Sequence, residues 1–195
     1  MRLDPAKLAP FTLSLRLANL PRLFAARHSA TPANTGHGSS RFSSPSRSFR
    51  TLYAAADFET ALAEAVIRDR FEGRARRVIY QATLETFVAT EIGSSRSLAL
   101  LDLTGDHGYR LGINTDAIRG RTHQPGQLFA EALVSQIGHD GILYSSRLTG
   151  ATCFALFDTA ISTLHGAPAV QLLRVAGLAG ELSRLEIIVR RRRGP

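Results

Sequence analysis

The sequence predicts an α+β fold. Segments of strand character are interspersed with only a few helical segments, whereas a doubly wound parallel sheet would show regular alternation of the two. Hydrophobic residues make up 44% of the 195 residues, a proportion typical of globular proteins. This length suffices for one domain with a core of its own, so we expect a single domain over residues 1–195.

The first fifty residues combine two apolar segments with a long polar loop. Leucines and Phe11 give Pro5–Leu20 the surface of a short helix, which Pro21 ends because proline breaks a helix. Arg22–Arg27 has the character of a short strand. Residues 28–50 are rich in Ser, Pro, Thr, Gly and Asn, which predicts a long loop, and long loops in compact domains are usually functional or disordered.

A strand followed by a helix is the clearest local unit. Thr51–Ala55 has strand character, and Asp57 is suited to cap a helix from Phe58 to about Phe71. Gly73 is the expected end of this unit.

The remaining elements are expected from their apolar patterns and turn residues. Turn signals fill residues 104–126, and Gly138 fits the end of the helix before it. The predicted strands are Arg77–Ala89, Leu98–Leu103, Gly141–Ser145, Cys153–Phe157 and Leu182–Val189, and the predicted helix is Gln127–Ile137.

The net charge of +8 is carried almost entirely by arginine, since Lys7 is the only lysine. Guanidinium groups bind phosphate and carboxylate bidentately. A phosphate-bearing ligand, an acidic protein partner or nucleic acid would each explain the excess, as would genome base composition. Arg190–Arg193 is expected to be a solvated tail because no aromatic residues interleave with it.

Several common functional motifs are absent. The sequence has no Gly-x-Gly-x-x-Gly turn, no phosphate-binding Gly-Lys-Ser/Thr loop and no Gly-x-Ser-x-Gly elbow. His107, His123 and His139 match no zinc spacing, so no metal is expected. Cys153 lies in an apolar run, which favours a buried, inert thiol over a nucleophile.

The chain also lacks the marks of export. Its single cysteine cannot form an intrachain disulfide, no apolar run approaches ~20 residues, and the N-terminus does not read as a signal peptide. We therefore expect a cytoplasmic protein without a membrane partner.

Four segments are unusual for purely structural sequence. They are RLFAARH from Arg22, RFS from Arg41, LYAAADFETALAE ending at Glu64, and DGILYSSR from Asp140. In this order they resemble the RES domain family over about residues 21–158, with residues 159–195 as a C-terminal extension. The resemblance implies an ADP-ribosyltransferase-like fold with a mixed or antiparallel β core and a few flanking helices.

The resemblance also implies site residues. Arg22 matches the family arginine, Tyr53 the tyrosine and Glu64 the glutamate. Ser146 matches the serine, because that serine comes two places after the tyrosine of its strand. Arg41 matches the arginine of a Gly-Arg-Trp/Phe loop. This chain departs from the family in having Pro21 where an aromatic is common, so Arg27 stays an alternative to Arg22, and in having Ser39-Ser40 where Gly-Gly is common.

The family's chemistry gives each group a role. Members are toxins of RES/Xre-type toxin–antitoxin pairs that degrade NAD+ or transfer ADP-ribose. Glu64 would stabilise positive charge on the ribose or hold a ribose hydroxyl, and Ser146 would orient Glu64 or Arg22. Arg22, helped by Arg41, would bind phosphate, and Tyr53 would contact the nicotinamide ribose end.

Three functions therefore stay open. The first is an NAD+ glycohydrolase or phosphorylase toxin, with NAD+ as substrate and no further cofactor. The second is an ADP-ribosyltransferase that modifies a protein. The third, motivated by charge alone, is a nucleic-acid-binding module, although no helix-turn-helix is recognisable. The toxin hypothesis implies an antitoxin partner, an Xre-like DNA-binding protein that covers the active site with an acidic surface, and it implies no direct contact with nucleic acid.

From spacing alone, Glu64 has a simpler explanation. It lies one helical turn before Arg68 and off the apolar face, as in an exposed i,i+4 ion pair worth only about 0.3–0.5 kcal/mol. Only the joint order of the four segments favours a catalytic role for Glu64 over this structural explanation.

Overall fold

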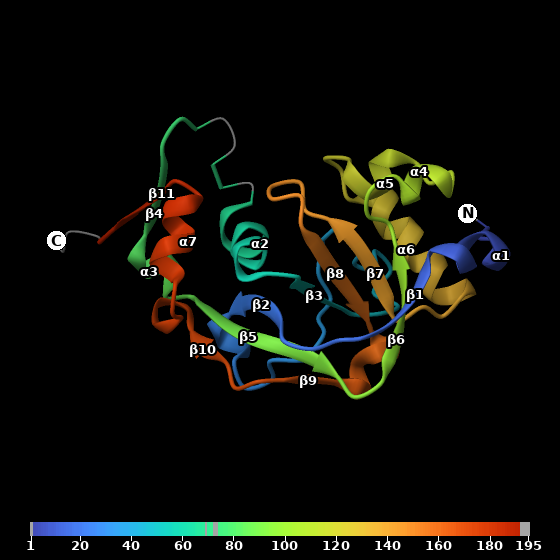
Figure 1. Ribbon diagram of the computed structural model, residues 1–195, viewed down its shortest axis with the longest axis horizontal. Helices are drawn as coiled ribbons and strands as arrows, with labels where there is room; N and C mark the ends of the chain where they lie inside the picture. Colours follow the sequence, from blue (N-terminus) through green and yellow to red (C-terminus); the bar gives the residue numbers. More distant parts are fainter. Residues whose placement is uncertain (1, 69, 72–73, 192–195) are drawn as a thin grey trace.

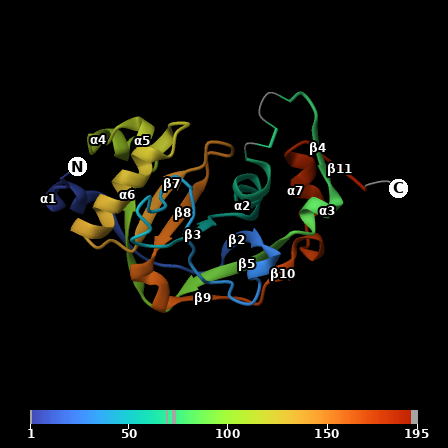
Figure 2. The same cartoon turned by 180° about the vertical axis from the view of Figure 1, so that it is seen from behind.

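The computed structural model describes residues 2–68, 70–71 and 74–191 and has an α+β fold with three sheets. Helix α2 (Phe58–Leu62) lies in the middle, between the five-stranded sheet and a small two-stranded sheet (Figures 1 and 2). The α+β class and the mixed β core predicted from the sequence are confirmed.

The largest sheet has the strand order β1-β6-β7-β8-β3. Its strands are β1 (Thr12–Arg16), β6 (Ser97–Asp102), β7 (Gly141–Ser145), β8 (Thr152–Phe157) and β3 (Thr51–Ala55). β6 and β7 run parallel, and the other neighbours run antiparallel. β7 and β8 form an almost fully buried hairpin, so the groups at its end have a rigid support.

A second sheet is built around one long strand. Its members are β2 (Leu20–Ala25), β5 (Phe87–Ser94), β9 (Leu164–Gly166) and β10 (Val170–Gln171). The other three all pair antiparallel with β5, and Arg22 of β2 lies opposite Thr90. This sheet therefore fixes the direction of β2, the strand that carries Arg22.

A third, two-stranded sheet lies at the end of the molecule away from α1 (Figure 1). It pairs β4 (Arg77–Tyr80) in parallel with β11 (Ile187–Arg190). The short helices α3 (Gln81–Leu84), η5 (Leu172–Arg174) and α7 (Leu178–Arg184) accompany it.

The opposite end is helical. Its elements are α1 (Pro5–Leu8), η1 (Ala9–Phe11), α4 (His107–Arg110), α5 (Thr115–Arg119) and α6 (Gln124–Gln136), and the 3-10 turns η2 (Ala26–His28) and η4 (Asp158–Thr163) lie elsewhere. α6 ends as predicted, because Gly138 adopts a φ of 77° and donates its N–H to Leu133 O at 3.1 Å. No helix of the described segments is long and apolar enough to cross a membrane.

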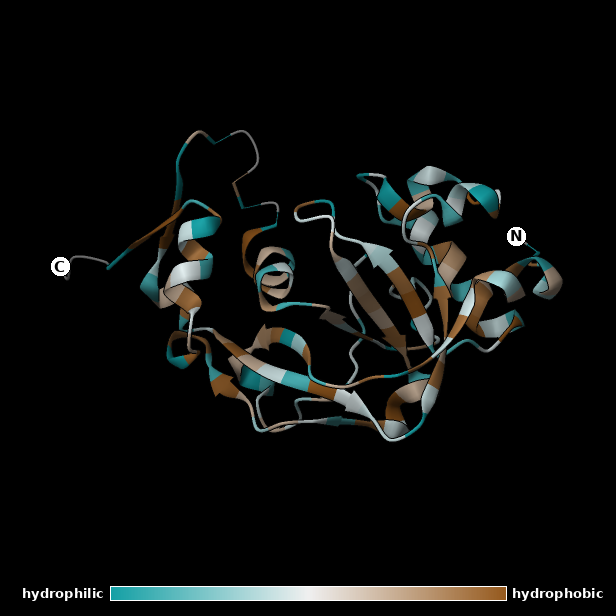
Figure 3. Cartoon of the chain, viewed as in Figure 1, coloured by the Kyte–Doolittle hydropathy of each residue, from teal (hydrophilic) through white to brown (hydrophobic). Residues whose placement is uncertain are grey.

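The long loop between η2 and β3 is predicted correctly, and its aromatic residues hold it to the domain. Phe42 and Phe49 are buried, and Phe42 packs edge-on against Tyr144 at 5.0 Å between ring centroids. Hydrophobic residues also run through β6 and β8 (Figure 3). The loop is therefore part of the folded core rather than a linker.

The unit β3–Asp57–α2 forms as the sequence predicts at its start and differs at its end. Asp57 caps α2 by accepting a hydrogen bond from Thr60 N at 2.7 Å. The helical segment then continues as a π turn and stops at Arg68, whose ψ of 136° is extended, so the predicted end near Phe71 is wrong. Gly73 lies outside the described residues.

Several other predicted boundaries are wrong. Within Pro5–Leu20 the helical turns end at Phe11 and β1 follows, because its alternating leucines pair with the distant β6. The predicted strand Arg77–Ala89 is interrupted by α3, and the first residues of Leu182–Val189 belong to α7. For β1, tertiary pairing overrides a weak local pattern, whereas the other two predicted strands are shortened by the local helices α3 and α7.

Gly141 offers a test of how tightly the β7–β8 hairpin is packed. A Cβ at this position would lie 2.5 Å from Ala155 O, inside the sheet. We expect Gly141→Ala to lower the free energy of unfolding by about 1–3 kcal/mol, because a methyl group is forced into a packed core. Urea unfolding followed by circular dichroism measures this change.

Gly180 is the matched control. It lies inside α7, and a Cβ there would have no atom within 4 Å. Gly180→Ala should raise the free energy of unfolding by about 0.5–1 kcal/mol because alanine loses less entropy in a helix. Equal effects of the two substitutions would contradict the packing described for β7.

Candidate functional site

Glu64 lies in a π-helical turn, η3 (Ala63–Ile67), that continues α2. The turn is defined by a hydrogen bond from Arg68 N to Ala63 O, five residues back, at 2.8 Å. Such turns are rare in proteins, and those that occur often lie at functional sites. Here the turn directs the Glu64 carboxylate toward the end of β7.

Ser146, directly after β7, holds that carboxylate. Its Oγ donates to Glu64 Oε1 at 2.6 Å and accepts from the backbone N–H groups of Leu148 and Thr149 at 3.1 and 3.3 Å. A hydroxyl has one hydrogen and two acceptor positions, so all three are used. Of the two partners expected for Ser146, Glu64 and Arg22, the structure shows a hydrogen bond to Glu64.

A second contact joins the loop between β7 and β8 to α2. Thr149 Oγ1 lies 2.8 Å from Thr60 Oγ1, one turn before Glu64. The β7–β8 loop is therefore attached to the helical segment at two points, which fixes Glu64 relative to the large sheet.

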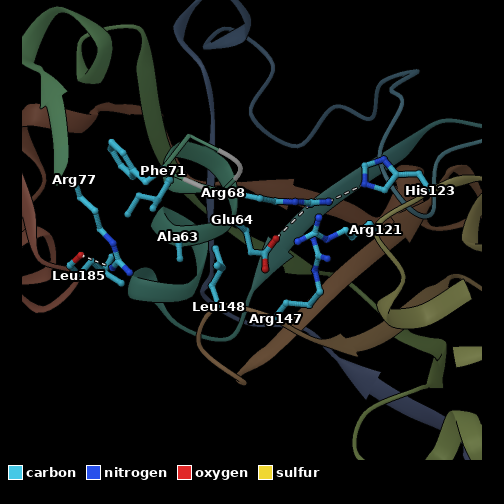
Figure 4. A pocket seen from close by; sticks show the side chains of 11 residues that line it. Ala63, Glu64, Arg68, Phe71, Arg77, Arg121, His123, Arg147, Leu148 and Leu185 are labelled. Atoms are coloured by element: carbon cyan, nitrogen blue, oxygen red, sulfur yellow. Dashed lines mark hydrogen bonds and ion pairs between the residues drawn. The ribbon is translucent and has the colours of Figure 1, made fainter. Parts of the chain in front are cut away.

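Arg68 occupies the other oxygen of Glu64. Its Nη1 lies 3.4 Å from Glu64 Oε2, and its Nη2 lies 2.9 Å from His123 Nε2 (Figure 4). The side chains of Glu64 and Arg68 are only 18% and 21% exposed. This is the i,i+4 pair that the spacing indicated, but it is largely shielded from solvent and forms part of a longer chain of contacts.

Glu64 and Arg68 line two cavities. The first, which we call the Arg22 cavity, has a volume of about 340 Å³; the second, the Arg121 cavity, has about 590 Å³. Both volumes are in the range of small-molecule sites. The Arg22 cavity is lined by Pro21, Arg22, Leu23, Phe24, Ser40, Tyr53, Ala54, Ala55, Ala61, Glu64, Ala65, Arg68, Phe87, Tyr144 and Cys153.

Arg22 enters its cavity from β2 and is half-buried. Its Nη1 donates to Asn34 O at 2.9 Å, and its guanidinium carbon lies 4.8 Å from the centre of the Phe24 ring. Within residues 2–68, 70–71 and 74–191 no carboxylate forms an ion pair with it. Burial lowers the pKa of Arg22 to about 10, which leaves the group charged near neutral pH. A buried cation without a carboxylate partner suits an anionic ligand.

Tyr53 lines the same cavity from β3. Its hydroxyl oxygen accepts from Phe42 N at 3.0 Å and lies 3.4 Å from Ser43 Oγ. Burial raises the pKa of Tyr53, so the phenol stays neutral. The hydroxyl therefore fastens the long loop, while the ring is left to face the cavity.

Arg41 lies apart from Arg22. Its guanidinium donates to Gly120 O at 2.6 Å and to Asp116 O at 3.4 Å, at the end of α5. It is buried, which lowers its pKa, and it lines only a small void of about 20 Å³ together with Tyr53 and Glu64. Its contacts attach the loop to α5, so the structure does not bring Arg41 and Arg22 into one cavity.

Arg27 is exposed in η2, and its Nε donates to His28 Nε2 at 3.1 Å. It lines neither cavity beside Glu64. Of the two arginines left open by the sequence, Arg22 is the one that the structure places near Glu64 and Tyr53.

The sequence analysis missed most of the Arg121 cavity. Arg121, His123 and Arg147 line it beside Glu64 and Arg68 (Figure 4). Arg147 directly follows Ser146, so its position in the sequence could have predicted its place near the site. Arg121 and His123 lie in a turn-rich segment, where no sequence pattern indicates a site.

Tyr144 and Cys153 form the inner wall of the Arg22 cavity. Burial raises the pKa of Cys153 to about 12, so its thiol is protonated and a poor nucleophile. The prediction that this cysteine is buried is confirmed. Among the described residues no group of three or more His, Cys, Asp or Glu side chains is arranged to hold a metal ion.

Comparison with solved structures supports the fold. A chain of the M. tuberculosis MbcT–MbcA toxin–antitoxin complex matches with a TM-score of 0.65 and 19% sequence identity. The match covers 93% of this chain and 95% of that one.

Two sequence comparisons agree with the resemblance. A protein of Sinorhizobium fredii named "probable toxin y4kH" is 36% identical over 85 residues, which are 43% of this chain and 67% of the relative. The family model described as "RES domain" matches residues 16–176, which include every candidate site residue. This chain therefore belongs to the RES domain family.

Proposed function

We propose that this chain is the toxin of a toxin–antitoxin pair and that it cleaves the nicotinamide–ribose bond of NAD+, by phosphorolysis or hydrolysis. The observation that carries the proposal is the Arg22 cavity, where a carboxylate fixed by two donors and a half-buried arginine without a carboxylate partner face one space. NAD+ has a matching pair of features, an anionic pyrophosphate and a ribose that becomes cationic during cleavage.

The roles of the two groups follow from their charges. Arg22 would bind the pyrophosphate through its guanidinium. Glu64 would lie beside C1′ of the nicotinamide ribose. As the C1′–N bond breaks, its electron pair stays with nicotinamide, which leaves as a neutral molecule, and C1′ gains oxocarbenium character that a nearby carboxylate stabilises. Ser146 would contribute by holding Glu64 in position before the reaction begins.

The Arg121 cavity supports an anionic acceptor. Arg68, Arg121 and Arg147 line it together with Glu64. Inorganic phosphate bound there would attack C1′ through an oxygen and give ADP-ribose 1-phosphate and nicotinamide. Water in the same place would give ADP-ribose, nicotinamide and a proton.

The toxin role is supported by the family and by the names of the relatives. A toxin of this kind requires an antitoxin, which we propose to be an Xre-like DNA-binding protein that covers the two cavities. The net charge of +8 favours an acidic contact surface on that partner. Because NAD+ is the proposed target, we expect the protein to act in the cytoplasm.

The carboxylate of Glu64 gives the first test. Glu64→Gln keeps the size of the side chain and an acceptor for Ser146 but removes the negative charge. We expect kcat for NAD+ consumption, measured as nicotinamide release by the purified protein with and without phosphate, to fall by about 100-fold or more.

Glu59→Gln is the control, since Glu59 lies on the same helical segment and pairs with Arg184 at 3.8 Å. It should retain wild-type activity. Expression of the wild type, but not of Glu64→Gln, should lower cellular NAD+ and arrest growth. If the wild type leaves NAD+ intact with water, phosphate and cell protein as acceptors, the proposal is wrong; label transferred to protein would instead support ADP-ribosyltransfer.

Arg22 and Arg27 form a second matched pair. Arg22→Gln should lower kcat/KM for NAD+ by about 10–100-fold, chiefly by raising KM, because a charge-assisted contact to pyrophosphate is lost. Arg27→Gln, at an exposed position outside both cavities, should behave as the wild type. The reverse pattern would assign the phosphate-binding role to Arg27.

A further inference from the structure

We propose that His123 is a positioning residue of this site: as a neutral imidazole with its hydrogen on Nδ1, it fixes Arg68 against Glu64. The effect on catalysis rests on the function proposed above, whereas the contact itself does not.

The hydrogen-bond partners of His123 determine its tautomer. Nδ1 lies 2.7 Å from Ser39 O, and a carbonyl oxygen only accepts, so Nδ1 carries the hydrogen. Nε2 lies 2.9 Å from Arg68 Nη2, and a guanidinium only donates, so Nε2 presents its lone pair. Only the neutral Nδ1–H form satisfies both contacts.

The imidazole is held from the side opposite Arg68. Gln127 Nε2 donates to Ser39 O and to Ser40 O, each at 3.2 Å, so the carbonyl that accepts from His123 is itself fixed. His123 directly precedes α6, and its own carbonyl accepts from Gln127 N at 2.9 Å. The loop before β3 and the start of α6 therefore hold the imidazole ring in place.

The other end of this chain of contacts is Glu64. Ser146 donates to Oε1 of the carboxylate, and Arg68 lies against Oε2, so the two donors together fix its orientation. The Arg68 side chain is long and has several rotatable bonds, and the contact of its Nη2 with His123 restricts its conformation. Without that contact, Arg68 would be held less firmly against Oε2 of Glu64.

A matched pair of variants tests the proposal. In His123→Gln the side-chain oxygen lies near the position of Nε2 and still accepts from Arg68. In His123→Asn the amide nitrogen lies near the position of Nδ1, so the variant keeps the donor to Ser39 and loses the acceptor for Arg68. Thermal unfolding of both variants establishes that each is folded.

We expect His123→Gln to retain kcat within about threefold at pH 8, and His123→Asn to lose about 10–100-fold in kcat with little change in KM, because a misplaced catalytic group slows the chemical step. Equal kcat values for the two variants would overturn the proposal.

A measurement independent of activity separates this proposal from the proposed function. Side-chain ¹⁵N NMR of the full chain, with His123→Gln to identify the signals, should show a protonated Nδ1 and an unprotonated Nε2 at pH 8. A hydrogen on Nε2 overturns the proposal whatever the activity. If the wild type consumes no NAD+ but shows the Nδ1–H form, the proposed function fails and the His123–Arg68 contact stands.

Discussion

The hydrogen bond from Ser146 to Glu64 is the contact on which the site depends. It joins the end of the buried β7–β8 hairpin to a π turn in a separate helical segment. Hydrogen bonds to charged groups contribute about 1.5–3 kcal/mol, which is enough to hold a side chain in one orientation. Because the hairpin is packed on both faces, the position of Glu64 is set by the large sheet rather than by its own short helix. Both cavities are arranged around that fixed carboxylate.

Arginine side chains supply much of the rest of the site, and each of them makes different contacts. Arg41 is bound to backbone carbonyls and attaches the long loop, Arg68 joins Glu64 to His123, and Arg22 faces its cavity beside an aromatic ring. A planar guanidinium is suited to all three tasks because it donates in several directions and tolerates burial better than an ammonium group. The outcome is one carboxylate that lines two cavities, each with arginine side chains in its wall.

The elements that sequence patterns predicted best are those defined by local chemistry. Thr51–Ala55 and Gly141–Ser145 are strands with the bounds expected, and Asp57 caps its helix because its partner is three residues away. The patterns failed where distant pairing decides, as for β1, whose partner strand is about 85 residues away in the chain. The π turn was not predicted because a widened turn leaves the apolar pattern of a helix almost unchanged.

The site itself was predicted in part. The resemblance named Glu64, Ser146, Tyr53 and Arg22, and the structure places these four around or beside one cavity. It gave no indication of His123, because its contact with Arg68 spans 55 residues and depends on the path of the loop before β3. Residue identity suggested the chemistry, and the fold decided which groups meet. The most direct measurement is a crystal structure of the Glu64→Gln variant with NAD+: the account predicts the pyrophosphate beside Arg22 and C1′ of the nicotinamide ribose beside residue 64, and an Arg22 cavity left without nucleotide at saturating NAD+ would contradict it.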